Sequence, residues 1–197
     1  MTGRNSRADV VSAAHRVLDE YGLGDLTMRR LATELDVRPS ALYHHFPGKQ
    51  ALLAAVADRI LGRTPLLPAD APLPADDEDW QVRLRLAANR LRDSLLSCRD
   101  GAEVVATVQA YGLGEIKPVE LFSELLAAPA PEGAGLDPDT ASVAARTLVF
   151  FVLGHTGDEQ VHLQAGSAGA INDEPRAESD FAIGLDIVLA GVARVAA

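Results

Sequence analysis

Glycine and proline divide residues 1–63 into short amphipathic segments, and this division constrains the fold more than any other feature of the sequence. Within each segment apolar residues recur every three or four positions, as they do on one face of an α-helix. Gly22 and Gly24 end the first segment, and Pro47 and Gly48 precede the last one. The expected helices span residues 7–21, about 27–35, 39–45 and 49–61. Three short helices before a longer one, with a tight turn between the second and third, are typical of a helix-turn-helix DNA-binding unit.

The turn of this unit is marked by local signals on both sides. Thr27 suits the N-cap of the second helix, and Pro39 suits the first turn of the third helix. We expect the turn itself at Asp36 and Val37. The apolar residues expected in the core of the unit are Leu31, Leu35, Leu42 and Phe46.

The net charge of −10 argues against a protein that binds nucleic acid, but the charge is unevenly distributed. Residues 1–63 hold nine Lys and Arg against seven Asp and Glu, a net charge of +2. The remaining residues hold nine against 21, a net charge of −12. Because phosphate binding needs a locally positive surface and not a positive protein, DNA binding by the N-terminal part is compatible with this composition.

The composition changes at residues 64–79, which hold four prolines and an acidic run from Asp76 to Asp79. We expect a linker there, between a DNA-binding domain at 1–63 and a second domain at 80–197. In the second domain helical spacing covers residues 80–99, 104–127 with a break at Lys117 and Pro118, a segment capped by Asp139 or Thr140, and a last helix from Phe181. Loops are expected at 129–138 and 166–176. The sequence therefore predicts an all-α fold.

The cysteine content and the hydropathy argue against a disulfide-bonded secreted protein and against a membrane protein. Cys98 is the single cysteine, so there is no internal disulfide, which fits a reducing compartment. No apolar run reaches the roughly 20 residues of a membrane helix, and the opening residues lack a signal peptide. We expect a soluble, cytoplasmic protein without a membrane partner.

The N-terminal segments resemble the TetR family of transcriptional regulators. The motifs that carry the resemblance are Leu26–Ala32, Leu42–Lys49 and Ala51–Leu53. Later motifs are similar to the C-terminal domain of the tetracycline repressor, namely Trp80–Gln81, Leu95–Ser97, Arg99–Ala102, Gly154, Glu159–Gln160 and His162. The resemblance implies a homodimer joined by a bundle of its last long helices, with a small-molecule pocket in each C-terminal domain. The spacing of Phe181, Leu185, Val188, Val192 and Val195 agrees with helix-against-helix packing of that kind.

The resemblance implies a double-stranded DNA operator as partner, read by the third helix. The DNA-binding residues that it implies are Thr27, Arg29, Arg38, Pro39, Ser40, Ala41, Tyr43, His44, His45 and Lys49. Their chemistry agrees, because Arg reads guanine bidentately and Lys and helix-start amides bind phosphate. Arg38 departs from the family, which often has a small capping residue there.

The implied effector pocket differs from that of the tetracycline repressor, which binds its drug as a magnesium chelate. Val105 stands where that repressor has a histidine, Val108 replaces a nearby polar contact, and Asp158 is one methylene shorter than the family's acidic residue. We therefore expect no tetracycline binding of the usual kind, and no cofactor. The expected effector is a small hydrophobic molecule contacted by Leu86, Arg90, Val105, Val108, Gln109, Phe122, Phe151 and His155.

Three other interpretations stay open. His155, Asp158, Glu159 and His162 share one helix face and offer donors for a divalent metal, although a polar helix face lining a pocket or dimer surface is the favoured reading. An enzyme would rest on this face or on Cys98, a residue type that usually serves packing. A DNA-binding protein without any effector is the third class.

Overall fold

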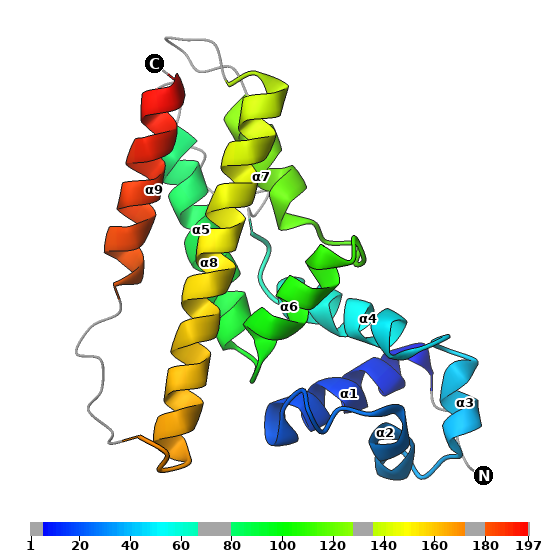
Figure 1. Ribbon diagram of the computed structural model, residues 1–197. Coiled ribbons are helices and arrows are strands. Elements are labelled where there is room, and N and C mark those ends of the chain that lie inside the picture. Colours follow the sequence, from blue (N-terminus) through cyan, green and yellow to red (C-terminus); the bar gives the residue numbers. More distant parts are fainter. Residues whose placement is uncertain (1–5, 67–79, 128–135, 172–179, 197) are drawn as a thin grey trace. The chain divides into compact units, whose positions relative to one another are not determined.

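The computed structural model describes residues 6–66, 80–127, 136–171 and 180–196, and regular secondary structure in these ranges is entirely helical (Figure 1). The helices are α1 (Arg7–Tyr21), α2 (Met28–Glu34), α3 (Pro39–Tyr43), α4 (Lys49–Leu61), α5 (Trp80–Leu96), α6 (Gly101–Ala110), α7 (Pro118–Ala127), α8 (Pro138–Ser167) and α9 (Phe181–Ala196). The prediction of an all-α fold is confirmed. None of these helices is long and apolar enough to cross a membrane.

The chain forms two compact units that divide it differently from the predicted domains. Unit 1 contains residues 1–63 and 94–116, and unit 2 contains residues 64–93 and 117–197. Helix α6 belongs to unit 1 because it packs against α4. The domain boundary expected at residues 64–79 stays a prediction. Residues 67–79 of this segment lie outside the described residues.

Unit 1 follows the predicted helices closely at its N-terminal end. Ser6 and Asp9 form a capping box at the start of α1, in which Asp9 accepts the backbone N–H of Ser6 at 2.8 Å. Thr27 caps α2 as expected, since its hydroxyl accepts the backbone N–H of Arg30 at 3.0 Å. The third helix ends at Tyr43, two residues earlier than predicted.

The turn between α2 and α3 is a Schellman motif. Asp36 adopts a left-handed conformation with φ of 52°. The backbone N–H of Asp36 donates to the Thr33 carbonyl at 3.2 Å, and that of Val37 donates to the Ala32 carbonyl at 3.0 Å. Because these bonds end α2 abruptly, the chain reverses within a few residues and α3 can pack against α2.

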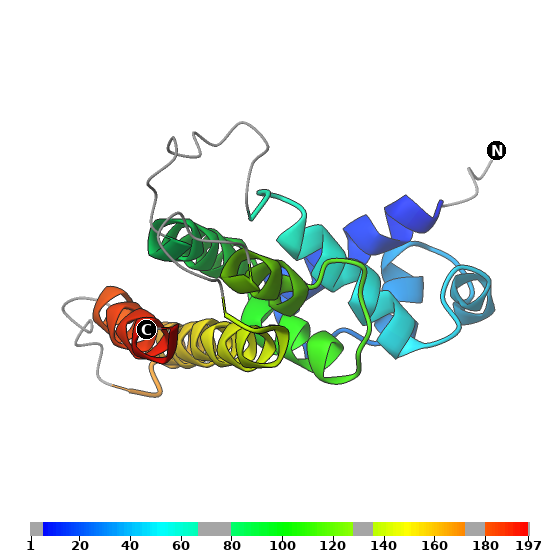
Figure 2. The same ribbon diagram turned by 90° about the horizontal axis from the view of Figure 1, so that it is seen from above.

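Unit 2 is built on the long helix α8, against which α7 and α9 pack (Figure 2). Asp137 caps α8 by accepting the backbone N–H groups of Asp139 and Thr140, so the predicted cap at Asp139 or Thr140 is wrong by two or three residues. The predicted break at Pro118 is confirmed as the start of α7. Helix α8 continues to Ser167, two residues into the loop predicted at 166–176. Most of the two predicted loops, residues 129–135 and 172–176, lies outside the described residues.

A glycine allows α9 to approach α8 closely. A Cβ atom at Gly184 would lie 2.7 Å from Cε2 and Cζ of the Phe151 ring. The ring in turn stacks on Phe181, with 5.4 Å between ring centroids. A side chain at position 184 would therefore require the Phe151 ring or one of the two helices to shift.

Candidate functional site

Helix α3 presents a polar outer face on a buried apolar anchor. Leu42 and Phe46 are 1% exposed and fix the helix in unit 1, as predicted, with Leu31 also buried and Leu35 half-buried. The residues of α3 and its ends that are exposed are Arg38, Pro39, Ser40, Tyr43 and His44, while Ala41 and His45 are half-buried. Tyr43, which is 52% exposed, adds an aromatic ring and a hydroxyl group to this face.

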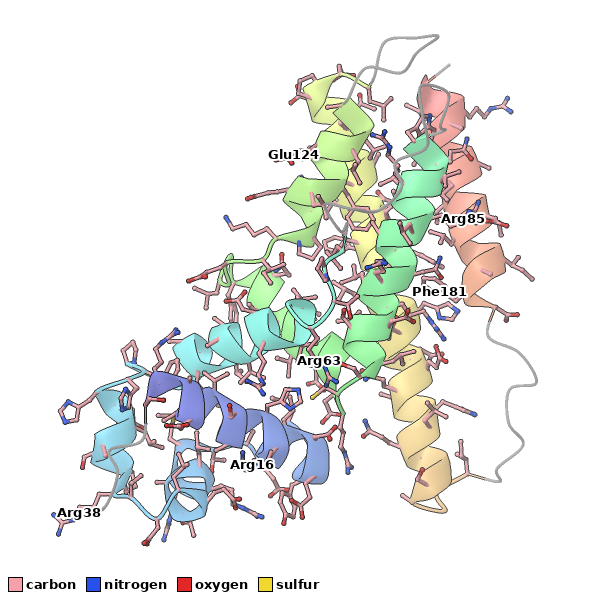
Figure 3. The ribbon with its side chains drawn as sticks, turned by 180° about the vertical axis from the view of Figure 1, so that it is seen from behind. Arg16, Arg38, Arg63, Arg85, Glu124 and Phe181 are labelled. Carbon is pink, nitrogen blue, oxygen red and sulfur yellow. The ribbon has the colours of Figure 1, made fainter. Side chains whose placement is uncertain are left out.

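Arg38 occupies the N-cap of α3 but does not cap it. Its side chain makes no hydrogen bond to the helix, and Pro39 follows it at the first helical position. Figure 3 shows its guanidinium extending away from the helices. The departure from a small capping residue therefore adds a cation to the outer face of α3.

The residues expected to meet phosphates lie on the neighbouring helices of unit 1. Thr27 and Arg29 are exposed at the start of α2, and Lys49 is half-buried at the start of α4. Gly48, the N-cap of α4, supplies no side-chain cap, so the first amides of α4 remain available to an anion. Arg30 differs from Arg29, because its guanidinium lies 4.0 Å from the centroid of the Tyr21 ring and is used inside the unit.

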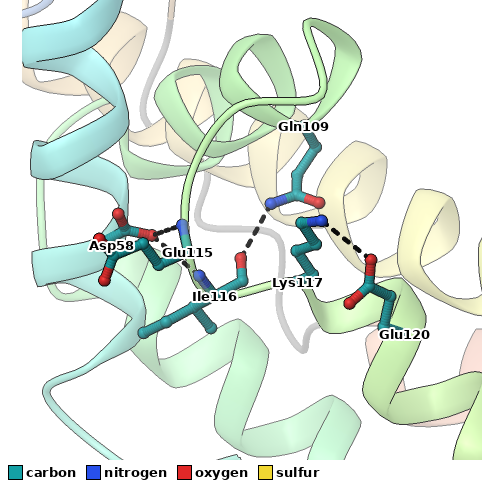
Figure 4. Close-up of polar contacts among 6 residues, drawn as sticks. All are labelled: Asp58, Gln109, Glu115, Ile116, Lys117 and Glu120. Atoms are coloured by element: carbon teal, nitrogen blue, oxygen red, sulfur yellow. Dashed lines mark hydrogen bonds and ion pairs between the residues drawn. The ribbon is translucent and has the colours of Figure 1, made fainter.

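Three predicted effector contacts belong to unit 1. Val105 and Val108 are fully buried in α6. The Gln109 side chain donates from Nε2 to the Ile116 carbonyl at 3.1 Å (Figure 4). Val105 and Val108 therefore belong to the core of unit 1, and Gln109 holds the segment that follows α6. The effector role of all three stays a prediction.

A carboxylate that the sequence analysis did not single out joins α4 to the segment after α6. Oδ1 of Asp58 accepts the backbone N–H groups of Glu115 at 2.8 Å and Ile116 at 3.0 Å (Figure 4). The only sequence signal was an acidic residue within an otherwise apolar helix face, which does not identify a partner 57 residues away. This contact ties the helix that begins with Lys49 to the end of α6.

The other predicted effector contacts belong to unit 2 and differ in exposure. Phe122 is fully buried, Leu86 is 37% exposed, and Arg90 donates to the Pro65 carbonyl at 3.1 Å. Phe151 and His155 form an aromatic cluster with Phe181, in which the His155 ring lies 5.7 Å from Phe151 and 5.4 Å from Phe181. Nδ1 of His155 is buried without a hydrogen-bond partner in the described part of the chain.

The polar face of α8 is tied to α5 by an ion pair. Nη2 of Arg92 lies 2.8 Å from both carboxylate oxygens of Glu159, and its guanidinium lies 5.0 Å from the centroid of the Phe181 ring. Within the described ranges, no three His, Cys, Asp or Glu side chains gather as a metal ion requires. His155, Asp158, Glu159 and His162 share a helix face, but the structure does not bring them together as a metal centre.

Cys98 lies in the core of unit 1, where it is 1% exposed. Burial, followed by the charges of Asp19 and Asp100, raises the pKa of its thiol to about 12. Because the thiolate is the reactive form, the environment of Cys98 suits packing and not nucleophilic catalysis.

Helices α8 and α9 expose apolar side chains to solvent, in addition to those that they bury against each other. Phe181, Leu185 and Val192, which the spacing suggested as an intersubunit seam, are instead buried against the protomer's own helices. The side chains left exposed, each 61–68%, are Val143, Phe150 and Val161 on α8 and Ile183, Ile187 and Val195 on α9. An apolar groove of about 330 Å³ between α8 and α9 lies among them. Exposed apolar surface of this extent is typical of an interface.

Known protein families match both the N-terminal and the C-terminal part of the chain. Residues 10–56 match the family model of bacterial regulatory proteins of the tetR family, and residues 73–179 match that of the tetracyclin repressor-like C-terminal domain. The tetracycline repressor protein class A from transposon 1721 of Escherichia coli is 31% identical over 202 residues, with 94% of this chain and 89% of that protein covered.

Two solved structures are similar over nearly the whole chain. The crystal structure of Mycobacterium smegmatis BioQ has a TM-score of 0.82 and 39% sequence identity, covering 96% of this chain and 98% of that one. The structure of BioQ with its double-stranded DNA operator has a TM-score of 0.78 and 40% identity, covering 95% and 98%. The chain therefore belongs to the TetR family of bacterial regulatory proteins, with a C-terminal domain like that of the tetracycline repressor.

Proposed function

We propose that this protein is a homodimeric transcriptional repressor that binds an operator through α3 and leaves it when a small hydrophobic molecule binds. The observation that carries the proposal is the polar, exposed outer face of α3 on a buried anchor of Leu42 and Phe46. The similar BioQ chain was crystallised with its DNA operator, which supports the same role here. A regulator of bacterial genes acts in the cytoplasm, where the DNA is.

The predicted DNA contacts divide between base edges and phosphates. Arg38, Ser40, Tyr43 and His44 would meet base edges in the major groove, where guanidinium and hydroxyl groups distinguish base pairs. Thr27, Arg29, His45 and Lys49 would meet phosphates and set the register on the duplex. Base specificity then depends on α3, whereas the salt dependence of binding is shared by all these residues.

A homodimer follows from the apolar face of α8 and α9. Val143, Phe150 and Ile187 are each more than 60% exposed, and an equivalent face of a second copy would bury them in a four-helix arrangement. The groove between α8 and α9 would accept apolar side chains of that copy. Two copies of α3 would then contact successive major grooves about 34 Å apart.

Release by an effector requires that the effector and DNA favour different arrangements of the same helix. Helix α4 suits this role because Lys49 begins it and Asp58, near its other end, is bonded to the segment after α6. We propose that ligand binding at the predicted effector residues shifts α4 through this bond. Since Val105 stands at the metal-linked histidine position, tetracycline with magnesium is not the expected effector.

We infer no enzymatic role. The pKa of Cys98 is raised to about 12 by burial, and the Glu159 carboxylate is occupied by Arg92, so the two catalytic candidates of the sequence have structural roles.

DNase I footprinting on the DNA flanking the gene tests the proposal. We expect protection of two half-sites whose centres are about 10 base pairs apart, or a multiple of that, since each subunit contributes one α3. The Arg38→Ala variant should lose protection at the same protein concentration, while Arg16→Ala, which removes an exposed arginine from α1, should retain it. No protection on any flanking fragment would contradict a locally acting repressor. If the operator is protected but no apolar compound of a test library releases the protein, the result would instead favour a DNA-binding protein without an effector.

A further inference from the structure

A pocket in unit 1 lies between α1 and the C-terminal end of α4. Among the described residues it is lined by His15, Arg59, Gly62 and Arg63, and its volume is about 600 Å³. Arg63 follows the last turn of α4 (Figure 3). Arg59, Gly62 and Arg63 are exposed, so the pocket is open to solvent, and its volume leaves room for a small organic molecule.

The polar side chains of this pocket have no partners in the described part of the chain. Nε2 of His15 is buried and accepts or donates no hydrogen bond there. Neither Arg59 nor Arg63 joins any of the ion pairs of the described residues. A buried polar atom without a partner is uncommon in folded proteins and points to a group that the protein binds.

The charges around His15 favour an anion. Burial and the charge of Arg59 lower the pKa of His15, with Asp19 raising it and Arg63 lowering it further. The Asp19 carboxylate also accepts the backbone N–H of Arg99 at 3.1 Å. Two guanidinium groups against one carboxylate leave the pocket positive, and a bound anion would stabilise a proton on the imidazole.

We propose that His15, Arg59 and Arg63 bind the oxyanion group, a phosphate or a carboxylate, of a small organic ligand. Guanidinium groups bind both oxyanions with paired, charge-assisted hydrogen bonds. The buried Nε2 atom of His15 supplies a third contact. When the imidazole takes up a proton on ligand binding, this atom donates a hydrogen bond to the oxyanion. The ligand thus bridges α1 and α4.

This site is separate from the proposed DNA contacts. Lys49 begins α4 and Arg59 follows ten residues later, about 15 Å along the helix axis at 1.5 Å per residue. The oxyanion therefore binds at the opposite end of α4 from the DNA phosphates. Its binding needs no DNA, so it can be measured on the protein alone.

Isothermal titration calorimetry of the full-length protein with inorganic phosphate and with citrate, at constant ionic strength in chloride, tests the site. We expect saturable binding of at least one of them, which the Arg59→Gln/Arg63→Gln variant weakens about tenfold or more. The control variant Arg16→Gln removes a positive charge from α1 at a residue that does not line the pocket, and it should stay within about twofold of the wild type. The anion that binds more tightly identifies the ligand as a phosphate or a carboxylate.

Proton NMR of the His15 imidazole gives an independent result on the unmodified protein. Saturating anion should raise the pKa of His15, with the resonance assigned from its absence in His15→Gln. The site would be disproved by no saturable binding of either anion, by equal binding in the Arg59→Gln/Arg63→Gln variant, or by an unchanged pKa of His15.

Discussion

The close approach of α9 to Phe151 makes Gly184→Ala a quantitative test of the packing in unit 2. The added Cβ would lie 2.7 Å from two ring carbons, whereas carbon atoms in contact are about 3.5–4.0 Å apart. About 1 Å of space must therefore be created. Movement of the half-buried Phe151 ring disturbs two contacts, because Phe181 stacks on it and His155 lies beside it.

The net effect follows from two opposing contributions. Overpacking of this kind costs about 1–3 kcal/mol, and the fixed ring places Gly184→Ala in the upper part of that range. Replacing glycine by alanine inside a helix returns about 0.5–1 kcal/mol. We therefore expect the free energy of unfolding to fall by about 2 kcal/mol, and Tm to fall by about 4–8 °C for a chain of this size.

A double-mutant cycle with Phe151→Leu separates this contact from other effects of the substitution. Urea unfolding followed by circular dichroism, at one protomer concentration because a dimer's stability depends on it, gives the four free energies. In the Phe151→Leu background, Gly184→Ala should cost nothing or stabilise, since the ring is gone, and the coupling energy should be about 2 kcal/mol. An equal loss in both backgrounds, or a rise in Tm for Gly184→Ala alone, would refute the packing described for α8 and α9.

Three further predictions concern other contacts. Asp58→Ala should lower the free energy of unfolding by about 2–3 kcal/mol in urea titrations, because two backbone N–H groups lose a charged acceptor, while the exposed Asp25→Ala should change it by less than about 0.5 kcal/mol. An equal effect of the two variants would argue against the bond between α4 and the segment after α6. The thiol of Cys98 should react with Ellman's reagent at pH 8 only in denaturant, because burial raises its pKa to about 12; rapid labelling of the native protein would contradict this. Ile187→Glu should shift the protein from dimer to monomer in light scattering, and a dimer unaffected by it would place the interface elsewhere.

Most of unit 1 could be predicted from the sequence because its signals are local. The capping residue Thr27, the turn before Pro39 and the glycine before Lys49 each act within a few residues, so helices α1 to α4 lie within about two residues of their predicted ends. Helix α6, predicted to begin at residue 104, begins at Gly101 and ends at Ala110. The buried positions Leu42 and Phe46 followed from helical spacing alone.

The features that escaped prediction depend on residues far apart in the chain. Nothing near Asp58 indicates that it holds Glu115 and Ile116, or that α6 therefore packs with the DNA-binding helices. The buried face of α9 was ambiguous, since apolar residues lie on more than one side of this helix. Ile187 is 68% exposed although its spacing is as regular as that of the buried Leu185.

The central claim, that the outer face of α3 reads a specific DNA sequence, is tested most directly by fluorescence anisotropy. The titration compares a duplex from the flanking DNA with its scrambled sequence at two salt concentrations. The variants are Tyr43→Ala and a control, Tyr111→Ala, which removes a tyrosine that is 63% exposed outside α3. The wild type should prefer the flanking duplex by about a thousandfold or more. Tyr43→Ala should lose about 10–100-fold of that preference, and Tyr111→Ala should lose none. Equal affinity of the wild type for both duplexes, or equal effects of the two tyrosine variants, would contradict the central claim.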